Sequence, residues 1–159
     1  MIGVLTRARS AAPRIAPAVP RDAVRLARIL GDWVRDTPWM PQLHDPAEDR
    51  EFLRRLIREK EVLTLRDRHG VLGFVVLDGD EVQALYLAQG ACGQGHGKRL
   101  LDAAKDRRDR LRLWAFQAND AARRFYAREG FVPVKFTNGE DNDEGLPDVR
   151  LVWQREGTA

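Results

Sequence analysis

The chain has 159 residues, of which 43% are hydrophobic and 32% are charged, values typical of one soluble globular domain with a single core. The formal net charge is +3, but acidic residues are interspersed with the basic ones, which disfavours nucleic-acid binding. The single cysteine, Cys92, excludes an intrachain disulfide and a cysteine-based metal cluster, and no apolar run is as long as a membrane span.

The first residues form a basic segment. Arg7 and Arg9 follow a very short apolar piece, whereas a secretory signal places its charge first and a longer apolar run second. We therefore predict a disordered basic tail over residues 1–13, a cytoplasmic location, and one domain over residues 14–156.

The next part of the chain predicts one strand and two helices. Residues 14–19 are short and interrupted by proline, which suits an edge strand. Apolar residues recur at helical spacing from Asp22 to Val34 and again after Asp45, where an aspartate cap precedes a first-turn proline.

Three antiparallel strands should follow. Residues 62–65 and 71–77 are apolar and flank a glycine-containing turn, so they predict a hairpin. The Asp78-Gly79-Asp80 turn then leads into a third strand over residues 82–87.

The last third alternates helices and strands. We predict helices over residues 98–109 and 119–129, with a strand over 111–116 that a helical crossover makes parallel to 82–87. Strands over 131–136 and 149–153 flank a polar loop. The sum is an α/β fold with a mixed, mostly antiparallel sheet of about seven strands and about four helices.

A glycine-rich loop joins the 82–87 strand to the next helix. Its glycines allow close approach of an anion to the main chain, and the first N–H groups of a helix have no intrahelical partner. The loop does not fit the dinucleotide fingerprint G-x-G-x-x-G, because Lys98 stands at the last glycine position. It does not fit a Walker loop either, because Cys92 stands at the first glycine and Arg99 at the hydroxyl position.

Two segments resemble the GNAT superfamily of N-acetyltransferases. The strand Leu85-Tyr86-Leu87 and the loop from Cys92 to Gly97 are similar to the L-Y-V strand and the [QR]-x-x-G-x-[GA] loop of that family, with Cys92 in place of Gln or Arg. Residues 119–131 are similar to the family segment N-x-x-A-x-x-[FL]-Y-x-x-x-G-F. The predicted element order is also that of the GNAT fold.

The resemblance implies acetyl-CoA as cosubstrate and a sheet splayed between the strands at 82–87 and 111–116. It places Tyr126 as the general acid that protonates the departing thiolate, although a core tyrosine is the alternative, and Asn119 as a contact of the pantetheine arm besides its role as a helix cap. The residues expected to bind the cofactor are Leu85, Tyr86, Leu87, Gly93, Gln94, Gly95, His96, Gly97, Lys98 and Asn119.

The resemblance also suggests a base for the attacking amine. Glu81 lies at the distance before the loop at which one branch of the family has a catalytic glutamate, whereas Trp114 stands where another branch has one. A water relay, or a purely solvated Glu81, are the alternatives. His44, His69 and His96 lack metal-ligand spacing, so we predict no metal.

Two segments are candidates for the acceptor pocket. Trp39 and Met40 lie between the first two helices, where core packing is the alternative. Asp141 belongs to an acidic cluster before the last strand, which suits a cationic amine or simply a solvated loop.

The sequence thus predicts an N-acetyltransferase that moves an acetyl group from acetyl-CoA to a primary amine, of a small molecule or a protein, by direct transfer in a ternary complex. A non-catalytic acyl-CoA-binding module of the same fold is the alternative. The predicted partners are CoA and an amine acceptor, without a membrane, and a homodimer is compatible with the sequence.

Overall fold

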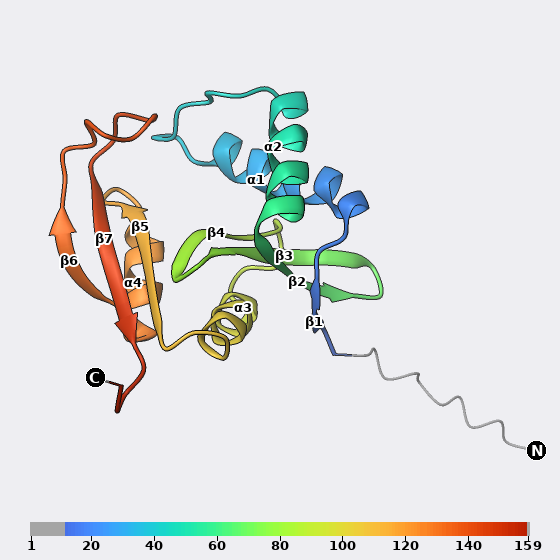
Figure 1. Ribbon diagram of the computed structural model, residues 1–159. Coiled ribbons are helices and arrows are strands. Elements are labelled where there is room, and N and C mark those ends of the chain that lie inside the picture. The colour runs from blue at the N-terminus through green and yellow to red at the C-terminus, as the bar shows by residue number, and fades with distance from the viewer. Residues whose placement is uncertain (1–11, 159) are drawn as a thin grey trace, which may run out of the picture.

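The computed structural model describes residues 12–158, and Figure 1 shows the arrangement of its elements. All strands belong to one sheet of seven strands in the order β1-β2-β3-β4-β5-β7-β6. The elements are β1 (Arg14–Pro17), η1 (Pro20–Asp22), α1 (Ala23–Asp36), α2 (Pro46–Glu59), β2 (Glu61–Asp67), β3 (Gly70–Asp78), β4 (Glu81–Leu87), α3 (His96–Lys105), β5 (Arg110–Phe116), α4 (Asp120–Arg128), β6 (Val132–Phe136) and β7 (Asp148–Gln154).

The sheet is antiparallel except between β4 and β5. These two strands run parallel and pair at one position only, Glu81 with Arg112. Beyond that position they separate, and Figure 1 shows β5, β7 and β6 turned steeply away from β2, β3 and β4. The predicted mixed sheet, the parallel pair and the splay are therefore confirmed, as is the order of a GNAT-like fold.

Two apolar cores cover the two faces of the sheet. Neighbouring residues of β3 serve both, because successive side chains of a strand point to opposite faces: Val75 packs with α3 and α4, and Val76 packs with α1 and α2. Helices α1 and α2 lie on β2, β3 and β4. Helix α1, which contacts β4, therefore lies beside the opening between β4 and β5.

Some boundaries differ from the prediction. Helix α3 begins at His96 and ends at Lys105 rather than spanning 98–109, because left-handed Gly95 starts it and i to i−3 hydrogen bonds of Arg107 and Arg108 tighten its end. A short 3₁₀ turn, η1, precedes α1, and its Asp22 pairs with Arg66 at 2.6 Å.

The predicted basic tail over residues 1–13 lies outside the described residues except for its last two positions. Among residues 12–158, no helix is long and apolar enough to cross a membrane.

Gly73 permits the close approach of β3 to the end of β4. A Cβ at this position would lie 2.6 Å from Leu87 Cδ2 and 2.8 Å from the Tyr86 carbonyl oxygen. We expect Gly73→Ala to lower the free energy of unfolding by about 1–3 kcal/mol through overpacking, measured by urea denaturation. In the control Gly31→Ala, within α1, the nearest atom lies at 3.7 Å, and a gain of about 0.5–1 kcal/mol is expected from helix propensity. An unchanged midpoint for Gly73→Ala would contradict the close packing.

Candidate functional site

The loop between β4 and α3 presents a row of main-chain donors. Gly93 and Gly95 adopt left-handed φ angles of +74° and +78°, which glycine allows without strain. Within residues 12–158, the N–H groups of residues 93–98 donate no hydrogen bond, and the first bond of the helix runs from Arg99 N to Gly95 O at 3.1 Å. These donors lie at the positive end of the α3 dipole, an arrangement that suits an anion.

The side chains of this loop differ in what they contact. Gln94 Nε2 donates to Gly90 O at 2.7 Å and so closes the loop on itself. His96 Nδ1 is buried and has no hydrogen-bond partner among the described residues. Lys98 Nζ lies 3.1 Å from Glu129 and 3.3 Å from Asp102, so this residue, which was expected to bind the cofactor, links α3 to the end of α4.

Tyr126 lies on α4, which the Asn119 side chain caps by accepting from Ala122 N at 3.1 Å. The Tyr126 side chain is only 8% exposed and packs between Phe125 and Phe131, with ring centroids 5.1 and 5.3 Å away. Burial, and in second place the nearby Tyr86, raise the pKa of Tyr126 above its ordinary value. The phenol therefore keeps its proton at neutral pH, as a general acid must.

Tyr86 lies on β4, on the side of the sheet that α1 covers. Its ring packs between Trp33 and Phe74, at 5.3 and 5.8 Å. Burial raises the pKa of Tyr86 to about 12, and the negative charge of Glu144 adds to the effect. The charge of Glu144 thus acts on Tyr86, and Tyr86 in turn acts on Tyr126. On β4, the neighbours Leu85 and Leu87 pack against the core formed with α3 and α4.

Glu81 lies where β4 and β5 pair, five residues before Tyr86. Its two carboxylate oxygens accept from the two terminal nitrogens of Arg150, both at 2.7 Å, and Arg112 Nε lies 3.4 Å from one of them. The Arg150 guanidinium also lies 5.1 Å from the centroid of the Trp114 ring. Both oxygens of the predicted base are therefore occupied by a cation. No sequence signal pointed to Arg150, because only the register of β7 brings it beside Glu81.

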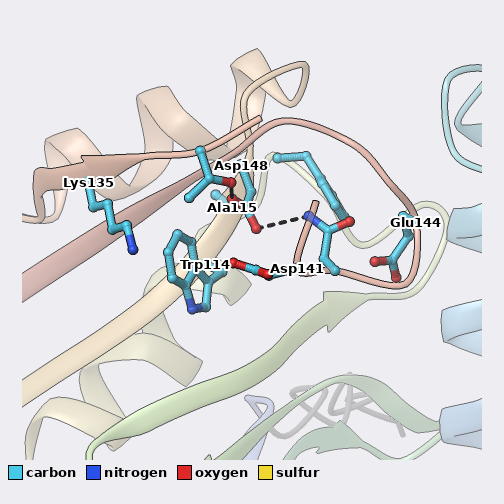
Figure 2. Close-up of a pocket in the computed structure, with 9 residues that line it drawn as sticks. Trp114, Ala115, Lys135, Asp141, Glu144 and Asp148 are labelled. Atoms are coloured by element: carbon cyan, nitrogen blue, oxygen red, sulfur yellow. Dashed lines mark hydrogen bonds between the residues drawn. The ribbon is translucent and has the colours of Figure 1, made fainter. Parts of the chain in front are cut away.

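A cavity of about 300 Å³ lies between β5 and the loop that precedes β7. Figure 2 shows the side chains around it. Asp141, which the sequence suggested for the acceptor side, lines it together with Glu144, while Asp148 is buried and bonded to Thr137 and Asn142. The lining residues are Trp114, Ala115, Phe116, Lys135, Thr137, Asp141, Asn142, Glu144 and Asp148.

A second cavity has a volume of about 270 Å³, and two residues that are far apart in the sequence lie next to it. Trp39 and Asn119 both line it. The Trp39 ring contacts Trp33 at 5.9 Å and Phe116 at 5.7 Å, and Phe116 lines the first cavity. Trp39 therefore stands between the two cavities. Met40 lines neither of them.

Residues 58–133 match the family model described as the acetyltransferase (GNAT) domain. This segment contains the glycine loop and Tyr126. The chain therefore matches the GNAT acetyltransferase domain over residues 58–133.

Solved structures share the fold of the GNAT domain at low sequence identity. The apo form of YjaB from Escherichia coli has a TM-score of 0.75 at 20% identity, covering 89% of this chain and 97% of that one. A GCN5-related N-acetyltransferase from Rhodopseudomonas palustris has 0.71 at 22%, covering 91% and 97%. YncA from Salmonella typhimurium, a putative acetyltransferase solved with its cofactor acetyl-CoA, has 0.72 at 19%, covering 94% and 97%. No curated protein matches significantly in sequence.

The GNAT domain contains only two tyrosines, Tyr86 and Tyr126, so their ionisation can be followed without interference. Since both pKa values are raised, we expect tyrosinate absorbance at 295 nm to stay absent well above the ordinary pKa of 10.0. In the unfolded chain both phenols ionise at their ordinary pKa. The stability that their neutral forms contribute is therefore complete below pH 10 and declines as the pH rises toward about 12. One tyrosinate per chain at pH 10 in folded protein would contradict the burial.

Proposed function

We propose that this GNAT domain is an acetyl-CoA-dependent N-acetyltransferase that acetylates a primary amine by direct transfer in a ternary complex. One observation carries the proposal: the loop with the donor row at residues 93–98 packs against α4, the helix that holds the buried, protonated Tyr126. Phe125, next to Tyr126, is the nearest neighbour of a Cβ built on Gly97, at 3.5 Å. Packing through Phe125 thus fixes the position of the proposed anion-binding loop relative to the helix that carries the proposed proton donor.

The residues present fit acetyl-CoA as cosubstrate. The N–H groups of residues 93–98 would bind its pyrophosphate, and the buried Nδ1 of His96 offers one further polar atom beside them. The main chain of Leu85, Tyr86 and Leu87, together with Asn119, would orient the pantetheine arm. Bound acetyl-CoA supplies the activated acetyl thioester.

Tyr126 would give its proton to the sulfur as the amine displaces it, because a thiol is a far better leaving group than an unprotonated thiolate in a buried site. Trp39, Met40 and Asp141 would contribute to the acceptor side. Glu81 is the base that the family resemblance suggests. Since Arg150 holds both of its oxygens, Glu81 could take a proton only as that ion pair loosens or through a relayed water.

A non-catalytic acyl-CoA-binding module is the second candidate, and the engaged Glu81 carboxylate favours it. Calorimetry with CoA and a thiol-release assay over a broad set of amines separate the two functions. CoA binding without thiol release on any amine would favour the module, whereas amine-dependent release supports the enzyme.

If Tyr126 is the general acid, removing its hydroxyl group should strongly lower kcat. We expect Tyr126→Phe to lower kcat about 100-fold, the range typical of general acid catalysis, while the Kd for CoA measured by calorimetry stays within about twofold of wild type.

Phe131→Leu is the matched control, because it disturbs the same aromatic cluster and leaves the hydroxyl in place. It should lower the thermal midpoint but retain most of the turnover. Wild-type kcat in Tyr126→Phe would rule out the acid role.

The donor row predicts a selective effect of loop glycines. Gly95→Ala places a Cβ on a residue with φ of +78°, which costs about 1 kcal/mol and should shift the donors, so we expect the Kd for CoA to rise at least about tenfold. Gly90→Ala is the control, because Gly90 has the same φ of +78° but precedes the donor row. Equal losses of CoA affinity in both variants would mean general loop strain, not a pyrophosphate site.

A further inference from the structure

The cavity between β5 and the 137–147 loop has an uneven distribution of charge. Figure 2 shows Lys135 and Glu144 at opposite sides, with Trp114 and Asp141 between them. Trp114, 44% exposed, and Phe116 form an apolar wall, which strengthens electrostatic interactions inside the cavity. A cation is repelled at the Lys135 end and attracted at the Glu144 end.

We propose that the acceptor is a cationic amine whose ammonium group binds between Glu144 and Asp141, and that Glu144 takes its proton. The proposal rests on the acetyltransferase function and names both its substrate class and its proton acceptor. It assigns a catalytic role to a loop residue that the family motifs do not include.

The partners of the nearby carboxylates single out Glu144 and Asp141. Glu81 is bound by Arg150 through both oxygens, and Asp148 accepts from Asn142 Nδ2 at 3.1 Å and from the Thr137 hydroxyl. In the described part of the chain, by contrast, neither Glu144 nor Asp141 has an ion-pair or hydrogen-bond partner. They are the cavity carboxylates that can bind an added cation without losing a protein contact.

Glu144 is also the cavity carboxylate whose charge acts on Tyr86, on the strand that borders the opening. Its charge raises the pKa of Tyr86, and Tyr86 in turn acts on Tyr126. The Tyr86 hydroxyl has no hydrogen-bond partner within residues 12–158, although its ring is packed between Trp33 and Phe74.

The proton balance is complete with groups on this chain. One proton passes from the ammonium nitrogen to a Glu144 oxygen, and the freed lone pair forms the C–N bond to the acetyl carbon while the C–S bond breaks. Tyr126 gives its proton to the sulfur, and the surplus proton on the new amide nitrogen returns to Tyr126. Glu144 then releases its proton to solvent.

The test uses the full chain, acetyl-CoA and four probes: tyramine, putrescine, spermidine and a lysine-containing peptide, which distinguish small amines from a protein side chain. We expect thiol release with at least one of them. Glu144→Gln should lower kcat for that amine about 100-fold without changing the KM for acetyl-CoA. Asp141→Asn should mainly raise the KM for the amine.

Glu140→Gln is the matched control, because Glu140 lies on the same loop, is exposed and lines neither cavity. It should behave as wild type. Wild-type kcat in Glu144→Gln, or an equal loss in Glu140→Gln, overturns the inference while leaving the acetyltransferase function intact. Absence of thiol release with every amine, together with retained CoA binding, overturns both.

Discussion

The ion pair between Glu81 and Arg150 determines how the two halves of the sheet meet. Arg150 comes from β7 and Glu81 from the first residue of β4, and Arg112 of β5 approaches the same carboxylate. This is also the only position at which β4 and β5 pair. Removing Glu81 would leave the Arg150 guanidinium without its carboxylate partner, and breaking a buried pair in this way typically costs about 3–5 kcal/mol. The pair therefore closes the sheet at one end, and the opening on which the site depends begins immediately beyond it.

Satisfied and unsatisfied polar groups are not distributed evenly over the described residues. Away from the opening, several charges are paired, as in Asp22 with Arg66 and Lys60 with Asp78. Around the opening lie the free N–H groups of residues 93–98, the buried Nδ1 of His96 and the carboxylate of Glu144. Buried or enclosed polar groups without partners are costly, so their concentration at one place favours a ligand that satisfies them.

The sequence predicted most of the fold because local signals agreed with one another. Alternating apolar residues, glycine turns and the Asp45 cap located every strand and every α-helix to within a few residues, but not the short η1 turn. The two family segments located the donor row and Tyr126. Contacts that depend on the register of distant strands could not be predicted in this way. Arg150 reaches Glu81 across 69 positions of the sequence, and Trp114 gave no sign that it would form the wall of a cavity. The acidic loop was recognised, but its composition could not show that Glu144 rather than Asp148 is left without a partner.

The aromatic rings that bridge the opening have a mechanical consequence. Tyr86 on β4 contacts Trp33, Trp33 contacts Trp39, and Trp39 contacts Phe116 on β5, each with ring centroids less than 6 Å apart. Such contacts contribute about 0.5–1.5 kcal/mol each beyond their buried area, and packed rings are nearly incompressible. Two indole groups thus act as a spacer of fixed thickness between the half-sheets. The width of the entrance is set by these rings, so a wider or narrower entrance requires their rearrangement, whereas the loop before β7 can change conformation without altering that width.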